Sequence, residues 1–499
     1  MEKYDKYLAL ILCCIAWLIT ILLPKTILVH NKMIFVIMGL GFCLYFYLSF
    51  RKEGYSVNKI CEFIFVGSFL VRLFYIWSTP YNISPHDLGK IVFGSTITGG
   101  HLGYIGYLLY YHHLPSFNPL DVWGFYNPPL YHIISALWLK FNLLLKADWQ
   151  LAVNNLRILT LFYITLSVTI FGKLLDEFKI TGYAKLVIFT LFAFFPSLIW
   201  LSGTLSSDSL VFLIMLLILF QTIKWYNNKT FKNIIILAFI FGFGMLVKLQ
   251  IAFLILGIVY IILASILHVL RFDNQKAILY VKQGLLFATI SFPLDCFWGL
   301  RNFILYKIPL TYVPALGVNS EQYIGVTSFW NRLGLPALKQ LPYAQVKYQP
   351  LLDCNIWLTM FRTALFDEGN IIKFTSKTSE CLGIILLYIT ILTVVFMAGC
   401  SLFIFYKRCF SVPKQLNYLL IFMGLSLFLS YIRFCFAYPH VCTMNFRYIA
   451  FLFCLPCLGA GMYFTKEQSK GYLFKVFTGT VVVESLLGVI LYIHYCWLL

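Results

Sequence analysis

The chain has 499 residues, of which 61% are hydrophobic, 19% aromatic and only 11% charged. A soluble protein is about 45–50% apolar and about 25% charged, so this chain has too few charges to cover a soluble surface. The composition excludes a cytosolic enzyme, a nucleic-acid-binding module and a disordered scaffold. The formal net charge of +19 comes from Lys and Arg in short loops between apolar runs. We therefore predict a polytopic membrane protein with lipid, and no nucleic acid, among its partners.

The apolar runs are long enough to cross a membrane, since a hydrocarbon core of about 30 Å needs about 20 residues of helix. We expect an all-α integral membrane protein, because no run alternates with a period of two and backbone groups in lipid need internal partners. The two runs around Lys248 form either two spans or one broken helix. In chain order, the sequence predicts about thirteen spans, at residues 7–24, 33–50, 60–79, 152–175, 184–201, 208–224, 234–247, 250–270, 278–298, 381–404, 416–434, 447–464 and 473–498.

Basic residues gather in every second connecting loop, which predicts the orientation through the positive-inside rule. We expect the N-terminus in the cytoplasm and the C-terminus outside. High usage of Lys, Ile, Asn, Phe and Tyr is typical of an AT-rich genome and favours a bacterial plasma membrane. The predicted inner loops carry Lys3 and Lys6; Arg51, Lys52 and Lys59; Lys173, Lys179 and Lys185; Lys224, Lys229 and Lys232; Arg271, Lys276 and Lys282; Lys407, Arg408 and Lys414; and Lys466, Lys470 and Lys475.

Two predicted outer segments, about 80–151 and 299–380, are too long to be simple connectors. Both are rich in Trp, Tyr, Phe and Leu, which predicts ordered juxtamembrane helices rather than disorder. The chain then divides into two additional N-terminal helices (1–59), a core (60–298) that includes the first outer loop, the long outer loop 299–380, and C-terminal helices (381–499).

The first outer loop contains the sequence HDLG, with His86 followed by Asp87. A carboxylate at the membrane interface can accept a proton from a hydroxyl nucleophile. The alternative is structural, because Asp is a favoured helix N-cap and Asp87 precedes an apolar stretch.

Two further ionisable residues lie at predicted outer ends of spans. Asp208 stands in SGTLSSDSL, where a charge close to hydrocarbon is costly and is usually functional or paired. A cap of the following helix is the alternative. Lys248 ends the Gly-rich segment GFGMLVKLQ, where its cation can bind a lipid phosphate or extend to the interface.

Two arginines complete the set. Arg301 and Asn302 end one span, and Arg447 and Tyr448 begin another. The planar guanidinium group suits phosphate, although an arginine at such a position is also a common interface anchor. Together with the residues above, the arginines place two acids and three cations, from five segments, on one side of the membrane. This combination favours a site for an anionic lipid with acid–base chemistry beside it, and no nucleotide-binding glycine motif is present.

The order of these motifs resembles the GT-C superfamily of polytopic glycosyltransferases, and most closely the branch of protein O-mannosyltransferases and the lipid A aminoarabinose transferase. HDLG (86–89) matches the family's acidic motif in the first outer loop, and YNPPLYHIISALWL (126–139) is similar to its Pro-Pro juxtamembrane helix. Five further motifs follow in the family's order: LAVNNLRILTLFY, SGTLSSDSL, GFGMLVKLQ, FWGLRN and FRYI. Many relatives have Asp-Glu where this chain has His86-Asp87.

The resemblance implies transfer of a sugar from a polyprenyl-phosphate donor to a hydroxyl of a glycan, lipid or protein, with inversion and without an essential metal or other cofactor. Asp87 would be the catalytic base, with Asp208 as a second catalytic residue. Lys248, Arg301 and Arg447 would bind the donor phosphate. His86 and Asn302 are further substrate-binding candidates, and His101, Tyr104, Tyr126 and Tyr448 would line the sugar pocket unless they belong to the interfacial aromatic belt. A lipid-linked polysaccharide polymerase or ligase, or a transporter or flippase of lipid-linked sugars, is the alternative.

Overall fold

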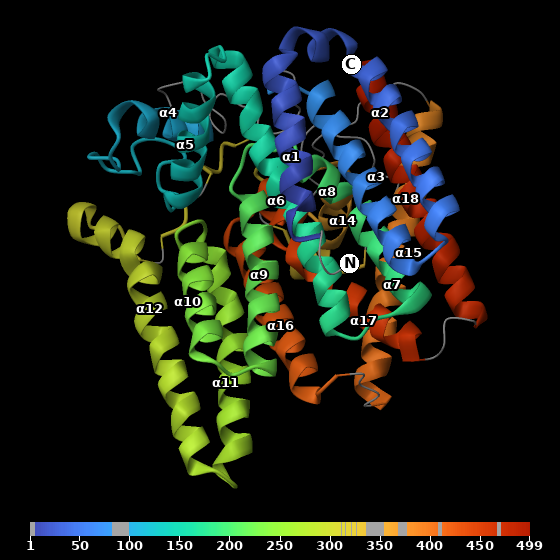
Figure 1. Cartoon of the computed structure of the whole chain (residues 1–499). Helices are drawn as coiled ribbons and strands as arrows, with labels where there is room; N and C mark the ends of the chain where they lie inside the picture. Colours follow the sequence, from blue (N-terminus) through green and yellow to red (C-terminus); the bar gives the residue numbers. More distant parts are fainter. Residues whose placement is uncertain are drawn as a thin grey trace.

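The structure is a computed structural model that describes residues 5–81, 99–310, 312–314, 316–320, 322–325, 327–335, 354–367, 377–407, 412–466 and 471–499. Within these ranges the regular secondary structure consists of helices (Figure 1). One isolated antiparallel β-bridge joins Tyr323 and His440. The predicted all-α class is therefore confirmed for the described part of the chain.

Among the described residues, nine helical segments are long and apolar enough to cross a membrane, which makes the chain compatible with a multi-pass membrane protein. Eight are single helices, and the ninth is the short 3-10 helix η1 (Leu249–Leu254) running into α11 (Ile255–Leu270). The other eight are α2 (Pro24–Glu53), α3 (Val57–Ser78), α6 (Trp149–Glu177), α9 (Asp208–Asn227), α12 (Asn274–Tyr306), α15 (Lys377–Lys407), α16 (Lys414–Ala437) and α18 (Tyr472–Leu498).

The remaining four predicted spans coincide with shorter helices, so the total of thirteen stays a prediction. The predicted spans 7–24 and 234–247 correspond to α1 (Asp5–Leu22) and α10 (Phe231–Met245). The predicted span 447–464 is only partly α-helical, because α17 (Cys454–Lys466) follows two short 3-10 helices, η4 (Phe446–Tyr448) and η5 (Ala450–Phe453). The fourth is the predicted span 184–201. That last span is in fact two helices, α7 (Gly182–Ala193) and α8 (Pro196–Leu201). Pro196 has no N–H to continue the helix and favours the first helical position, so a new helix begins there.

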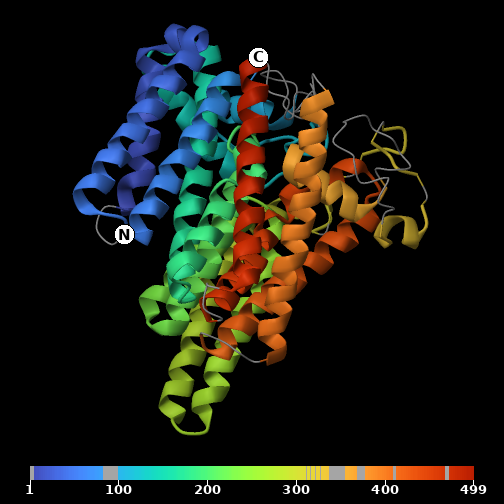
Figure 2. The same cartoon turned by 90° about the vertical axis from the view of Figure 1, so that its right-hand side faces the viewer.

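The two predicted long loops contain short helices. The first contains α4 (Gly100–Tyr111) and α5 (Leu130–Leu144), and the second contains α13 (Phe329–Leu333) and α14 (Ile356–Phe366). Helix α5 begins directly after Pro129, as the Pro-Pro sequence predicts. In Figures 1 and 2, α4, α5 and the C-terminus lie toward one end of the helix stack, whereas the hairpin between α11 and α12 marks the other.

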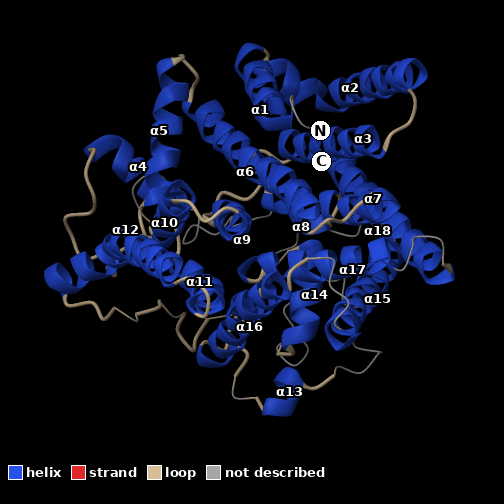
Figure 3. Cartoon of the chain, turned by 60° about the horizontal axis from the view of Figure 1, so that its bottom comes forward, coloured by secondary structure: helices blue, strands red, loops and turns tan. Residues whose placement is uncertain are grey.

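The centre of the stack is formed by α6 and α9, which pack against each other, with α10 on the other side of α9 (Figure 3). Both central helices are buried over most of their length. In contrast, α2 exposes most of its apolar side chains, including Leu40 and Leu44. So large an apolar surface on one helix is suited to lipid rather than water.

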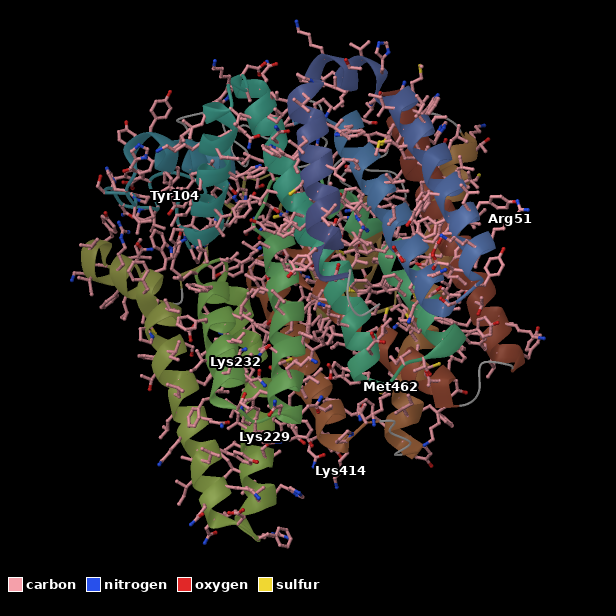
Figure 4. All side chains as sticks on the ribbon, in the orientation of Figure 1. Arg51, Tyr104, Lys229, Lys232, Lys414 and Met462 are labelled. Atoms are coloured by element: carbon pink, nitrogen blue, oxygen red, sulfur yellow. The ribbon has the colours of Figure 1, made fainter. Side chains whose placement is uncertain are left out.

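Three lysines of predicted inner loops lie at the end of the stack away from α4. In Figure 4, Lys229, Lys232 and Lys414 lie well below Tyr104 of α4. The three lysines belong to loops that the sequence assigns to the inner side, and Tyr104 belongs to the first outer loop. These three lysines therefore lie at the other end of the stack from α4, whereas Arg51, which also belongs to a predicted inner loop, lies in Figure 4 at about the height of Tyr104.

A fully buried arginine joins the two segments that lead to the candidate site. The Arg157 guanidinium of α6 donates to the carbonyl oxygens of Ile76 and Thr79 at the end of α3. It also donates to the Gly203 carbonyl oxygen at 2.8 Å, in the loop before α9. A buried charge without such partners would cost several kcal/mol, so these carbonyls fix the position of both segments.

Gly203 is expected to tolerate no side chain. A Cβ atom there would lie 2.5 Å from Arg157 Nη2 and 2.7 Å from the Tyr75 ring, both of which are fully buried. We expect Gly203→Ala to lower the free energy of unfolding by about 1–3 kcal/mol, the usual cost of overpacking, as a fall in Tm of the purified protein. Gly41→Ala is the control, because nothing lies within 4 Å of that Cβ position. Equal Tm values for the two variants would contradict the tight fit.

Candidate functional site

Asp208 lies at the centre of a charged cluster. It is the first residue of α9 and its side chain is buried. Its carboxylate oxygen Oδ1 lies 2.5 Å from Lys248 Nζ, and Oδ2 lies 3.6 Å from Arg447 Nε. The Ser206 hydroxyl donates to Oδ2 at 3.2 Å. Helix α9 receives no side-chain cap from Ser207, and the Asp208 carboxylate is engaged with cations. Asp208 therefore does not act as the helix cap that the sequence left open.

Lys248 reaches Asp208 from a sharp turn between α10 and η1. Two glycines near the end of α10 allow close packing before this turn, since a Cβ at Gly242 would lie 2.6 Å from Leu294 of α12 and one at Gly244 would lie 2.8 Å from Ile251 of η1. Lys248 itself has extended backbone, and its ammonium group also lies 4.7 Å from the centre of the Tyr448 ring. The lysine is thus held by a carboxylate and an aromatic face instead of extending to the interface.

Arg447 is positioned by the second outer loop. It belongs to the short 3-10 helix η4 (Phe446–Tyr448), and Asn445 caps η4 by accepting a hydrogen bond from the Arg447 N–H at 2.9 Å. The Asn445 amide donates in turn to the Asp367 carboxylate at 2.8 Å, just after α14. The Phe446 N–H donates to the Thr363 hydroxyl on α14 at 2.9 Å. Helix α14 therefore fixes the backbone that carries Arg447.

Tyr448 links the two cations. Its ring lies 4.7 Å from Lys248 Nζ and 5.3 Å from Arg447 Cζ, both measured to the ring centre. The Gln250 side chain donates to the Tyr448 backbone carbonyl at 2.5 Å. Asp208, Lys248 and Arg447 together leave one positive charge in excess, which suits a cluster that binds an anion.

Two histidines stand beside this cluster. His101 of α4 lies within electrostatic range of Asp208, and its Nδ1 lies 3.0 Å from Nε2 of His132 on α5. Burial, and next the neighbouring His101, hold the pKa of His132 well below its usual value, so His132 is neutral at physiological pH. The Leu130 N–H donates to the Leu246 carbonyl at 3.0 Å, which ties the start of α5 to the turn before Lys248.

The other predicted residues flank the cluster. Tyr104 stacks on His132 with ring centres 4.3 Å apart and lies within electrostatic range of Arg301. Burial is the main effect that raises the pKa of Tyr126 to about 12. Tyr126 also lies within electrostatic range of Arg447. Its carbonyl accepts a hydrogen bond from Trp298 Nε1 at 2.8 Å.

Arg301 lies at the edge of this arrangement rather than in the ion-pair cluster. Its guanidinium donates to the Asn302 side chain at 2.9 Å and to the Pro115 carbonyl. Its Cζ also lies 5.1 Å from the Trp298 ring centre and 5.7 Å from that of Tyr306. Arg301 therefore joins α12 to the first outer loop, and Asn302 holds the Arg301 side chain.

Asp87 and His86 lie outside the described residues. The structure thus brings together Asp208, Lys248, Arg447 and Tyr448, with His101 nearby. Within the described ranges, no group of three His, Cys, Asp or Glu side chains gathers in a way that could hold a metal ion.

Sequence reasoning missed the residues that hold the site in place. His132 contacts the predicted residue His101, Asn445 contacts the backbone of Arg447, and Asp367 accepts a hydrogen bond from Asn445. Asp367 offered one signal, as an acidic residue in a long aromatic-rich outer loop. The pairing of His101 with His132 offered none, because it joins two helices separated by an irregular segment.

The described part of the chain is all-helical, is compatible with a multi-pass membrane protein, and contains a partly buried cluster of one carboxylate and two cations at the start of α9. No known protein-family model matches the chain, and no curated protein matches it.

Proposed function

We propose that the protein is a membrane glycosyltransferase that moves a sugar from a polyprenyl-phosphate donor to an acceptor hydroxyl at the outer face of the membrane, with inversion. The observation that carries the proposal is the contact of Asp208 with Lys248 and Arg447. These three residues come from three separate segments, and their charges sum to one positive charge. The acceptor is a glycan, a lipid or a protein.

In the proposed reaction, Lys248 and Arg447 bind the donor phosphate and stabilise the charge that develops on it as the sugar leaves. Preorganised cations aimed at developing charge are often the largest catalytic contribution. Arg301, bound to the Pro115 carbonyl, would hold the first outer loop and extend the cationic surface. Asp208 keeps both cations in place, and Asp87 accepts the acceptor's proton.

The outer location is supported by the distribution of basic residues. The cluster lies at the end of α9 that is opposite Lys224, and the loops with Lys229, Lys232 and Lys414 lie away from α4 (Figure 4). By the positive-inside rule these lysines face the cytoplasm, which gives a cytoplasmic N-terminus, an external C-terminus and a site on the external side of the plasma membrane.

The direct test uses purified protein in lipid vesicles with radiolabelled polyprenyl-phosphate sugars and a panel of hydroxyl acceptors. We expect a glycosylated product of inverted anomeric configuration, and a glycan acceptor that grows by repeated units would identify the polymerase or ligase form of the same chemistry. Binding of the donor with movement across the vesicle and no product would overturn the proposal in favour of a transporter or flippase.

A further inference from the structure

Glu484 is a carboxyl group near the middle of α18 that the proposed reaction does not use. Its side chain is 1% exposed, and its oxygen Oε1 accepts a hydrogen bond from the Thr390 hydroxyl of α15 at 2.9 Å. Helices α15 and α18 pack against each other (Figure 2). In the described part of the chain, the other oxygen, Oε2, is buried without a hydrogen-bond partner. An ionisable side chain inside a membrane span is rare and usually functional, so Glu484 points to a ligand.

No basic side chain in the described ranges forms an ion pair with Glu484. The two buried cations on the neighbouring helices have other partners, since Arg72 donates to a backbone carbonyl and a serine hydroxyl, and Lys185 pairs with Asp176 at 2.5 Å. Helix α8 has no titratable side chain. The buried titratable side chains of the other helices around α18 are Cys61, Arg72 and Tyr75 of α3, Lys185 of α7, Cys400 of α15, and Cys454 and Cys457 of α17.

The charge of a carboxylate at this position has to be neutralised. Burying an unpaired charge is far more costly than burying a hydroxyl or an amide. A proton neutralises the carboxylate by forming the uncharged acid, and Na⁺ does so by coordination to carboxylate and hydroxyl oxygens. Both are small monovalent cations, and both fit an oxygen that lacks a partner.

The surroundings of Glu484 have a feature that is typical of cation sites in membrane proteins. Gly488, one turn further along α18, packs against the break between α7 and α8, where a Cβ atom would lie 3.1 Å from Pro196 and 3.9 Å from the Phe194 carbonyl oxygen. Helices that are broken inside the membrane expose backbone carbonyls, and such carbonyls bind Na⁺ or protons in several transporter folds. Ser485 adds a buried hydroxyl without a hydrogen-bond partner among the described residues.

We propose that Glu484, together with Thr390, binds a small monovalent cation, a proton or Na⁺, between α15 and α18. The site is separate from the cluster at the start of α9, so the inference does not depend on the proposed function. Because Glu484 and Thr390 belong to different helices, the folded chain binds the cation more tightly than the unfolded chain. The stability that the cation contributes is therefore lost when Na⁺ is removed and the pH is raised.

The first test is infrared spectroscopy of the purified protein in lipid vesicles, with wild type compared with Glu484→Gln. An uncharged carboxylic acid has a C=O stretching band above the amide bands, and Gln removes this band while it keeps the size of the acid. With a bound proton, wild type should show the band at neutral pH in both NaCl and choline chloride. With bound Na⁺, the band should be missing in NaCl and should appear when choline replaces Na⁺ and the pH is lowered.

Thr390→Val is a second variant for the same spectrum. Valine keeps the shape of threonine but lacks the hydroxyl that donates to Glu484 Oε1. The band of the acid should therefore shift to higher frequency, because its C=O group loses a hydrogen-bond donor. This shift identifies the band even if Glu484→Gln does not fold.

The second test is the pH dependence of Tm. Glu484→Gln has no charge to neutralise, so in choline chloride the wild-type Tm should fall between neutral and alkaline pH by at least about 2 °C more than that of the variant. NaCl should reduce this difference if the ligand is Na⁺ and leave it unchanged if the ligand is a proton. Asp121→Asn, which removes an exposed carboxylate, is the matched control and should follow wild type.

Two results would overturn the cation site. One is a wild-type spectrum without the band of the acid in every condition, and the other is the same pH dependence of Tm in wild type and in Glu484→Gln. Neither readout uses a sugar donor. Failure of sugar transfer would therefore contradict the proposed function alone, and loss of the cation site would leave the proposed function standing.

Discussion

Asp87→Asn is expected to lower the rate of sugar transfer by about 10²–10⁴-fold, the usual contribution of a general base. Asn has nearly the same shape as Asp and is an equally good helix N-cap, so a structural role of Asp87 would survive the change. The amide cannot accept the proton of the attacking hydroxyl. Donor binding should change much less than the rate, because Lys248 and Arg447 hold the phosphate in the proposed reaction.

Asp121→Asn is the matched control for that experiment. Asp121 is an exposed carboxylate in the same outer loop, so its replacement should leave the rate of sugar transfer unchanged. Single-turnover rates with the bound labelled donor would separate the chemical step from binding. If Asp87→Asn retained activity within about tenfold of the parent, Asp87 would not be the base, and the acidic motif HDLG would have a capping role.

The architecture was largely readable from the sequence because hydrocarbon imposes a single strong constraint on each span. Long apolar runs predict helices in any context, and the helices lie where the runs are. The exception at Pro196 was also local, since proline lacks the N–H that a continuous helix needs. Hydropathy averages over such a break, so the predicted span 184–201 hid two helices.

Part of the candidate site was predictable for a similar reason. A charge near hydrocarbon needs a partner or a function, so Asp208, Lys248 and Arg447 stood out one by one. The topology predicted that they lie on one side of the membrane with Asp87 and Arg301, and the structure brings these three into contact, whereas Arg301 lies apart and Asp87 is outside the described residues. The sequence could not say that Asp208 would contact both cations, because that depends on how α10 and η4 pack around the start of α9.

The supporting contacts were not predictable because they join distant segments without a periodic signal. Asp367 and Asn445 are 78 positions apart, and His101 and His132 are 31 positions apart. Each is an ordinary polar residue in its own segment. Only the folded chain shows that α14 and α5 hold the residues that the charge pattern singled out.

Lys248→Met is expected to lower sugar transfer by about 10²–10³-fold, comparable to the loss of one preorganised group that stabilises developing charge. Methionine retains the length and the apolar contact with the Tyr448 ring but has no charge. Asp208 would keep only Arg447, whose Nε lies 3.6 Å away. Breaking a buried ion pair costs roughly 3–5 kcal/mol, and since the Lys248 side chain is 21% exposed we expect about 2 kcal/mol of lost stability.

A double-mutant cycle separates the two losses. Asp208→Asn alone leaves two cations facing each other and should also lower Tm, whereas Asp208→Asn with Lys248→Met removes one charge of each sign and should restore part of the stability. Transfer should remain low in the double variant, because the phosphate still lacks Lys248. Lys232→Met, an exposed lysine at the other end of α10, is the control and should leave both readouts unchanged. Recovery of transfer together with stability in the double variant would mean that the ion pair only holds the fold, and the anion site would have to lie elsewhere.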